Sequence, residues 1–271
     1  MTTATWPKRA RPRRPQHGLV LSGREHALFS DLAWAGFFTT GQIQRLAFPS
    51  RRRTQRRLRA LLDHGYLRAH LQGGALHRDT LWTLGPRGLA LLRDEGAIRD
   101  DARSYRLNPN SQKLSHAIAV RDVAVSFLVA KTRGMLAVTD LRLDGELANR
   151  SPFREARLVP DGLAVIEDGG ATRIVMWEVN CAGQPLAQVR QKLLAYVRVQ
   201  ASGVPLFSAP SLTVLVGADG ERRLVNIRDF AASLDGELEV LPISLRDLCE
   251  AERLPDLVDL PWRSTGFRPV A

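Results

Sequence analysis

Two acidic side chains stand where a predicted β-hairpin would bring them together, and this arrangement suits a divalent metal ion. Asp161 ends the triplet Val159-Pro160-Asp161, and Glu178 begins the triplet Glu178-Val179-Asn180. The turn sequence Asp168-Gly169-Gly170 lies between them and predicts two paired strands with one acid on each. Carboxylate oxygens are the ligands that Mg²⁺ and Mn²⁺ prefer, and an ion held in this way polarises a phosphate and activates water. Asp161 and Glu178 are therefore candidate metal ligands.

The same acids also admit a plainer interpretation. Acidic residues that flank a hairpin are often solvated, or they form ion pairs with nearby cations such as Arg157 and Arg173. Alternation along a strand places Glu178 and Asn180 on one face, while Trp177 points to the other face and is expected in the core. A shared metal site and a pair of solvated edge residues both remain open from the residues alone.

The segments around the hairpin predict a mixed α/β core. Hydrophobic periodicity predicts a helix over residues 113–131, strands over 135–143, 157–167 and 172–180, a helix over 185–200, a strand over 211–217, a helix over 221–234 and a strand over 238–243. The order α-β-β-β-α-β-α-β is typical of a mixed sheet with helices packed on it.

A second set of residues with chemical potential lies in an arginine-rich segment. Residues 51–65 predict a helix capped by Ser50, with Leu58, Leu61 and Leu62 on its buried face. The outer face then carries Arg51, Arg52, Gln55, Arg56 and Arg59. Arginine pairs bidentately with guanine or clamps phosphates, and glutamine suits an adenine edge. A solvated charged face is the alternative interpretation of such a run.

The neighbours of this helix predict a winged helix-turn-helix. The expected elements are helices over 22–35 and 41–48 before it, and strands over 66–72 and 79–85 and a helix over 86–96 after it. Ser22 and Glu25 form a capping-box pattern at the first helix. In this motif the helix before the hairpin enters the major groove with its N-terminal residues. His77 and Arg78, in the predicted hairpin, are placed to touch the DNA backbone or the minor groove.

The charge is distributed unevenly along the chain. The 271 residues include 39 Lys/Arg and 28 Asp/Glu, which gives a net charge of +11. Residues 1–100 hold 18 Lys/Arg and 7 Asp/Glu and carry this whole excess, because the remaining 21 basic and 21 acidic residues cancel. A basic module joined to a neutral one is typical of a polyanion-binding domain with a separate partner domain. A basic solubility surface is the alternative.

Composition divides the chain into four segments and excludes several classes of protein. We expect a flexible basic arm over 1–18, a winged helix domain over 19–96, a linker over 97–112 and a second domain over 113–271. No stretch approaches the run of about eighteen apolar residues that a membrane span needs. Two cysteines are too few for a disulfide framework or a zinc site, and the N-terminal segment lacks the apolar core of a secretory signal. We therefore expect a cytoplasmic protein.

The second domain resembles the PD-(D/E)XK, or restriction-endonuclease-like, nuclease fold. That pattern has a Pro-Asp at the second strand and an acid-x-lysine triplet on the third. Pro160-Asp161 and Glu178 match it, whereas Asn180 stands where the pattern has lysine. The resemblance implies that the lysine's role, orienting the attacking water, would fall to Lys192 of the next helix, and that Asp122 would be the assisting acid of the first helix. It further implies Asp161, Glu178 and Lys192 as catalytic residues, with Mg²⁺ or Mn²⁺, if the site is active.

The whole chain resembles the replication-relaxation family of plasmids and integrative elements. The resemblance is carried by TTGQIQRLAFPSRRRTQRRLRALLDHGYL, LSHAIAVRDVAVSFL, PDGLAVIEDGG and WEVNCAGQPLAQVRQKLLAYV, which lie within residues 20–200. The last stretch closes with a Lys-x-x-x-Tyr pattern at Lys192 and Tyr196, and Tyr196 could either pack on the sheet or reach the site. The resemblance implies a DNA-binding protein of mobile elements with a nuclease-like domain.

Three functions are compatible with these observations. In the first, the winged helix binds double-stranded DNA and regulates replication, transfer or transcription of a mobile element, and Asn180 marks the second domain as degenerate. In the second, the protein is a Mg²⁺- or Mn²⁺-dependent DNA endonuclease or nickase, as Asp161, Glu178 and Lys192 favour. In the third, the second domain docks a replication or conjugation protein. We rank them in this order and expect a homodimer, because winged helix proteins often bind DNA as symmetric dimers.

Overall fold

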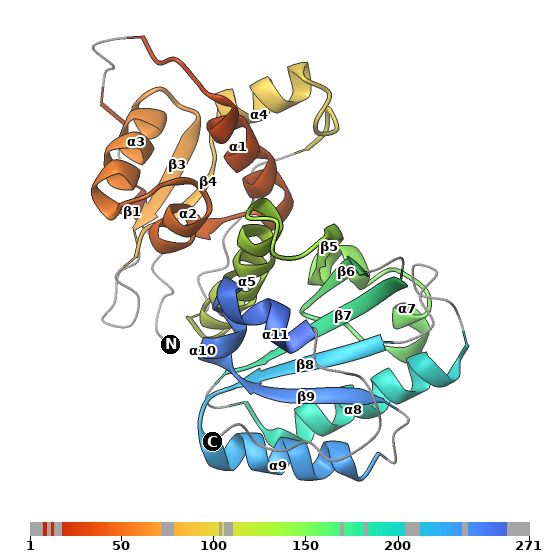
Figure 1. Cartoon of the computed structure of the whole chain (residues 1–271). Helices are drawn as coiled ribbons and strands as arrows, with labels where there is room; N and C mark the ends of the chain where they lie inside the picture. The colour runs from red at the N-terminus through yellow and green to blue at the C-terminus, as the bar shows by residue number, and fades with distance from the viewer. Residues whose placement is uncertain are drawn as a thin grey trace, which may run out of the picture. The chain divides into compact units, whose positions relative to one another are not determined.

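Two compact units make up the chain. The computed structural model describes residues 8–9, 12–13, 18–71, 79–102, 105, 111–168, 171–181, 184–203, 212–234 and 238–258. Contacts within the chain group residues 1–129 with 179–183, and residues 130–178 with 184–271. A four-stranded sheet belongs to the first unit and a five-stranded sheet to the second (Figure 1). None of the described helices combines the length and the apolar character needed to cross a membrane.

The first unit contains the helices and strands predicted before residue 97, together with most of one helix that the sequence analysis assigns to the second domain. They are α1 (Gly23–Ala35), α2 (Thr40–Ala47), α3 (Arg51–Asp63), β3 (Leu67–Leu71), β4 (Leu81–Leu84), α4 (Pro86–Asp94) and α5 (Ser111–Thr132). Two additional strands, β1 (Lys8–Arg9) and β2 (Phe38–Thr39), complete an antiparallel sheet in the order β1-β3-β4-β2. Strands of two residues carry no periodicity, so the sequence pattern could not show them.

Part of the N-terminal segment differs from the flexible arm that we expected. Lys8 pairs with Leu71 and Arg9 with His70, so both residues extend the sheet beside β3. The backbone N–H of Arg13 donates a hydrogen bond of 2.7 Å to Oδ1 of Asp63, at the end of α3. Two short stretches of this basic segment are therefore held against the first unit.

A buried carboxylate ties α1 to α3. Oε2 of Glu25 accepts a 2.8 Å hydrogen bond from the backbone of Ser22, which completes the predicted capping box. Oε1 of Glu25 accepts a 2.8 Å hydrogen bond from Arg57 of α3, and Arg57 also donates to the carbonyl of Val20. Because the Glu25 side chain is only 5% exposed, these bonds are shielded from water.

The helix α5, which the sequence analysis groups with the second domain, lies up to Val129 in the first unit. The buried side chain of Arg121 donates two hydrogen bonds, of 2.8 and 2.6 Å, to the carbonyl of Ala35 and stacks over the ring of Phe37. The side-chain amide of Gln42 in α2 donates a 3.0 Å hydrogen bond to Asp122. These polar contacts join α5 to the end of α1 and to α2.

From residue 138 onward, the second unit contains the predicted strands and long helices in the predicted order, and also several short helices that the sequence analysis did not predict. Its elements are β5 (Val138–Leu143), α6 (Asp144–Leu147), α7 (Phe153–Ala156), β6 (Gly162–Asp168), β7 (Ala171–Asn180), α8 (Leu186–Ala201), β8 (Leu212–Ala218), α9 (Glu221–Ala232), β9 (Glu239–Ser244), α10 (Leu245–Leu248), a 3₁₀ turn (Ala251–Arg253) and α11 (Leu254–Val258). The sheet order is β5-β6-β7-β8-β9, with β5, β6 and β7 antiparallel and β9 parallel to β8. The mixed α+β fold class is therefore confirmed.

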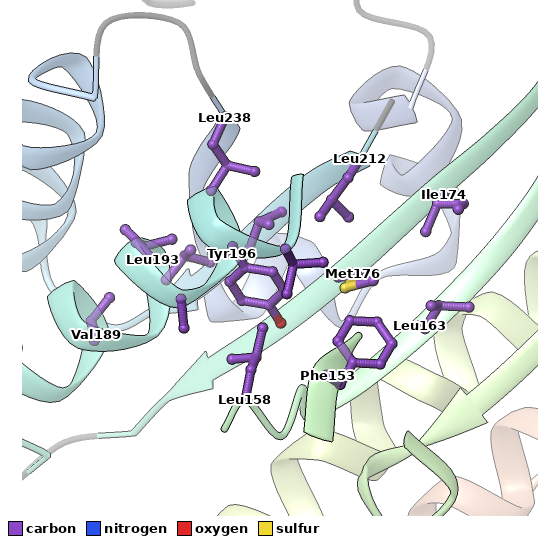
Figure 2. Close-up of a cluster of buried hydrophobic side chains, with 14 of the residues drawn as sticks. Phe153, Leu158, Leu163, Ile174, Met176, Val189, Leu193, Tyr196, Leu212 and Leu238 are labelled. Atoms are coloured by element: carbon purple, nitrogen blue, oxygen red, sulfur yellow. The ribbon is translucent and has the colours of Figure 1, made fainter. Parts of the chain in front are cut away.

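An apolar core holds α8 and α9 against one face of this sheet. Leu163 of β6 and Met176 of β7 share a buried cluster with Leu193 of α8 and Ile227 of α9. Figure 2 shows Phe153, Leu158 and Tyr196 in the same cluster. Burial of this apolar surface fixes α8 over the end of the hairpin that carries Asp161 and Glu178.

Replacing Glu25 by Gln should destabilise the first unit in a pH-dependent way. Burial raises the pKa of Glu25, but hydrogen bonds from Ser22 and Arg57 outweigh it and hold the pKa below its ordinary value of 4.5. This contribution is therefore present above pH 4.5 and lost as the pH falls through the lower, folded-state pKa. We expect Glu25→Gln to lose about 1–3 kcal/mol at neutral pH, measured by urea unfolding. The deficit should shrink at acidic pH.

The matched control is Glu95→Gln, because Glu95 pairs with His26 at a site where both side chains are more than one-third exposed. Its effect should stay small at either pH. An equal deficit for Glu25→Gln at neutral and acidic pH would contradict the ionic role assigned to Glu25.

Candidate functional site

The pairing of β6 with β7 brings the two candidate acids together. Gly162 pairs with Trp177, so Asp161, one residue earlier, and Glu178, one residue later, are neighbours at the end of the hairpin. Asp161 precedes β6 instead of lying within a strand as we predicted. The reason is local, since Pro160 has no N–H to donate to a ladder and the strand begins after it.

A glycine is required at the position after Asp161. A Cβ atom at Gly162 would lie 1.9 Å from Cζ2 of Trp177, so the indole ring occupies the space of any side chain there. Trp177 is completely buried, as alternation predicted. The contact sets the register in which Asp161 faces Glu178.

Two residues of α8 complete the site. Lys192 and Tyr196 are four residues apart and lie on the same side of the helix. Nζ of Lys192 donates a hydrogen bond to Oδ1 of Asp161, at 3.2 Å, and another to Oε2 of Glu178. The hydroxyl of Tyr196 donates a 2.6 Å hydrogen bond to Oε1 of Glu178. The structure thus brings together Asp161, Glu178 and Lys192, and places Tyr196 at the site as well as in the core.

Burial sets the electrostatics of this group. Asp161 and Glu178 are 6% and 5% exposed, so neither is a solvated edge residue. Burial, together with the charge of Asp161, raises the pKa of Glu178 above its ordinary value, and the contacts with Lys192 and Tyr196 oppose this shift. Burial acts to lower the pKa of Lys192, but the two carboxylates outweigh it and raise that pKa above its ordinary value. The ammonium of Lys192 is therefore a cation that offsets the charge of two closely spaced, buried acids.

Asn180 occupies the position where the nuclease pattern has lysine. It lies two residues after Glu178 on β7 and is 4% exposed. Its amide supplies no positive charge. In this chain the ammonium instead reaches the acids from α8, through Lys192.

The donor set fits a hard divalent cation. Mg²⁺ is commonly held by one or two carboxylates, with water and substrate phosphates completing its shell. Asp161 and Glu178 supply that pair, although nowhere in the described ranges do three or more His, Cys, Asp or Glu side chains gather into a metal-binding group. The candidate assisting acid Asp122 is engaged elsewhere, because Gln42 and Arg45 of α2 hold its carboxylate.

The predicted DNA-contacting residues of α3 lie largely at its surface. Arg52, Gln55 and Arg56 are exposed. Arg51 is exposed but forms a 2.8 Å ion pair with Asp79, and Arg59 forms an ion pair of the same length with Asp63 one turn later. His77 and Arg78 lie outside the described residues.

Two residues of this face escaped the sequence analysis. Arg53 is exposed near the start of α3, and its place in the run of three arginines was the available signal. Asp79 also accepts a 3.2 Å hydrogen bond from the backbone of Gly41, so it connects the start of α2 to Arg51. No local pattern indicates such a contact across 28 residues.

Replacing Tyr196 by Phe should remove one hydrogen bond to a buried carboxylate and keep the packing of the ring. We expect a loss of about 1–3 kcal/mol in the free energy of unfolding, because the Glu178 oxygen is left without its donor. Urea unfolding of the metal-free protein measures this. Tyr66→Phe is the matched control, since the Tyr66 hydroxyl accepts an exposed hydrogen bond from Arg87 and its loss should change little. Equal stabilities of wild type and Tyr196→Phe would contradict the contact.

Comparisons with known proteins identify a family for the chain. Among solved structures, the chain is similar to the restriction endonuclease FokI, with 13% identity and a TM-score of 0.35 over 93% of this chain. The match spans 48% of the FokI chain, so this chain covers about half of that protein's length. No curated protein matches the chain. The family model described as Replication-relaxation matches residues 29–206 of the 271. The chain belongs to the replication-relaxation family.

Proposed function

We propose that this protein binds double-stranded DNA through a winged helix in its first unit and cuts one DNA strand with a divalent-metal-dependent site in its second unit. The observation that carries the proposal is the contact of Lys192 with both Asp161 and Glu178. It supplies the positive charge that Asn180 lacks, and so favours a working site over the degenerate one that we ranked first from the sequence.

The order of elements in the first unit supports DNA binding. Three helices, α1 to α3, are followed by the paired strands β3 and β4, which is the order of a winged helix. The N-terminal half of α3 presents Arg52, Gln55 and Arg56 to solvent. The partial positive charge of a helix N-terminus adds to these side chains in attracting phosphates. Residues 1–100 also carry the whole net charge of +11.

The roles in the second unit follow from chemistry and position. Asp161 and Glu178 would hold Mg²⁺ or Mn²⁺, and Tyr196 fixes the orientation of the Glu178 carboxylate. The metal ion would polarise the scissile phosphate and lower the pKa of the attacking water. Lys192 would orient that water or donate a hydrogen bond to the phosphate, since its side chain, 37% exposed, is the member of the group that reaches solvent.

The number of metal sites that act on one DNA duplex decides whether the product is a nick or a double-strand break. The described part of each chain contains one such group of residues, which would break one phosphodiester bond at a time and give a nick. A homodimer bound to a two-fold symmetric sequence would present two sites, one to each strand. We favour the nick, because it needs only one such site and no second copy of the chain.

The proposed DNA-binding role of α3 can be tested by the affinity for duplex DNA. Arg52→Ala combined with Arg56→Ala should weaken duplex binding at least about tenfold and reduce the slope of log affinity against log salt by up to about 2. Fluorescence anisotropy over a salt series measures both quantities. The control is Arg133→Ala with Arg246→Ala, which removes the same charge from exposed positions in the second unit. If both double variants behave alike, α3 is not the DNA-reading helix.

The proposed metal site can be tested by cleavage of plasmid DNA. Supercoiled plasmid that carries the upstream region of the protein's own gene should be converted to the nicked form in Mg²⁺ or Mn²⁺ and stay intact in EDTA. Asp161→Asn should abolish nicking because it removes a ligand charge, while retardation of the same DNA on a native gel stays unchanged. Retardation without any nicking in either metal would support a regulator on an inactive scaffold and overturn the nuclease proposal.

A further inference from the structure

Lys192 contacts the carboxylate oxygens that a metal ion would need. The Tyr196 hydroxyl donates a hydrogen bond to Oε1 of Glu178, so Oε2 is the oxygen of this carboxylate that Tyr196 does not use. Lys192 donates to that Oε2 and to Oδ1 of Asp161. The ammonium therefore bridges the two acids that would hold a divalent cation, so a bound cation would compete with Lys192 for these carboxylates.

The two donors from α8 differ in their freedom to move. Tyr196 is completely buried in the apolar cluster with Phe153, Leu158 and Met176 (Figure 2), so it remains on Glu178. The Lys192 side chain is 37% exposed, whereas those of Asp161 and Glu178 are 8% and 7% exposed. Lysine has a flexible four-carbon stem that lets its ammonium reach water once another cation takes its place between the acids. Lys192 is thus the one of the two donors that can leave.

We propose that Lys192 is a displaceable internal cation that holds the metal-free site together and is expelled from the carboxylate oxygens when the metal ion binds. This inference rests on the metal site proposed above. Before metal binding, the ammonium neutralises two buried acids that would otherwise repel each other. After binding, the ammonium is released beside the metal ion, where it can meet the attacking water or a phosphate oxygen. Metal binding would therefore free the Lys192 ammonium to act on the attacking water or the phosphate.

Exchange of this kind lowers the apparent affinity for metal. Only molecules in which Lys192 has left the oxygens can accept the ion, so the measured dissociation constant is the intrinsic constant divided by that fraction. Removal of the ammonium should consequently tighten metal binding, although it removes a residue of the site. A purely structural lysine would give the opposite result, because its loss would disorder the ligands.

The test that needs no variant is lysine acylation of the wild-type protein with and without Mn²⁺, read out by peptide mass spectrometry. The Lys192 nitrogen is held between Asp161 and Glu178 in the metal-free protein, so these contacts should shield it from the reagent. The sequence contains four lysines, and Lys113 and Lys131 are exposed internal references. Mn²⁺ should raise the acylation of Lys192 severalfold and leave both references unchanged. Unchanged or slower acylation of Lys192, in protein saturated with Mn²⁺, would overturn the proposal.

Calorimetric titration with Mn²⁺ gives an independent measure. Lys192→Met should bind Mn²⁺ about tenfold more tightly than wild type. Lys192→Arg should bind like wild type, because it keeps the cation. Arg198→Met, which removes a charge from an exposed position of the same helix, is the control for general electrostatics and should also bind like wild type. Weaker binding by Lys192→Met, or equal tightening by Arg198→Met, would overturn the proposal.

These outcomes are separate from those of the proposed function. Release of Lys192 by Mn²⁺ in a protein that never nicks DNA would support the exchange and reject the nuclease. Nicking without any release of Lys192 would support the nuclease and reject the exchange. Failure of Mn²⁺ to bind both wild type and Lys192→Met would reject both proposals.

Discussion

The contact between Gly162 and Trp177 is the constraint on which the candidate site depends. The indole ring leaves no room for a Cβ atom at residue 162, and in return it fixes the register of the hairpin. That register places Asp161 beside Glu178, because each acid stands one residue beyond the pair. Two buried carboxylates in this position repel each other unless a cation lies nearby. Lys192 is such a cation, because it pairs with both acids.

The helix α8 supplies this cation and also packs on the sheet. Val189, Leu193 and Val199 bury an apolar stripe against the sheet. Lys192 and Tyr196 both donate hydrogen bonds to the carboxylates. Lys192 is a charged donor near solvent, whereas Tyr196 is a neutral donor in the core. A lysine at position 180 would instead be fixed on a buried strand. Support from a helix gives the ammonium more freedom than the strand position allows.

Much of this arrangement could be predicted from the sequence, and the parts that could not be predicted have physical causes. Periodicity predicted the long helices and strands of both units, because an apolar face of several turns or a run of alternating residues leaves a clear pattern. The pattern Pro160-Asp161 with Glu178 indicated the acids, and the missing lysine at 180 pointed to Lys192. The sequence could not decide whether Tyr196 packs or bonds, since it does both. The Arg51–Asp79 ion pair and the hydrogen bond from Gln42 of α2 to Asp122 are tertiary contacts, which leave no local sequence pattern.

The central claim is that Lys192 performs the task of the lysine that β7 lacks. Its most direct test is the rate of plasmid nicking by Lys192→Asn and by the double variant Lys192→Asn with Asn180→Lys. Alternation places residue 180 on the same strand face as Glu178, so a lysine there can also approach the acids. We expect the single variant to lose nicking and the double variant to recover a measurable part of it. Nicking by Lys192→Asn at the wild-type rate would contradict the claim.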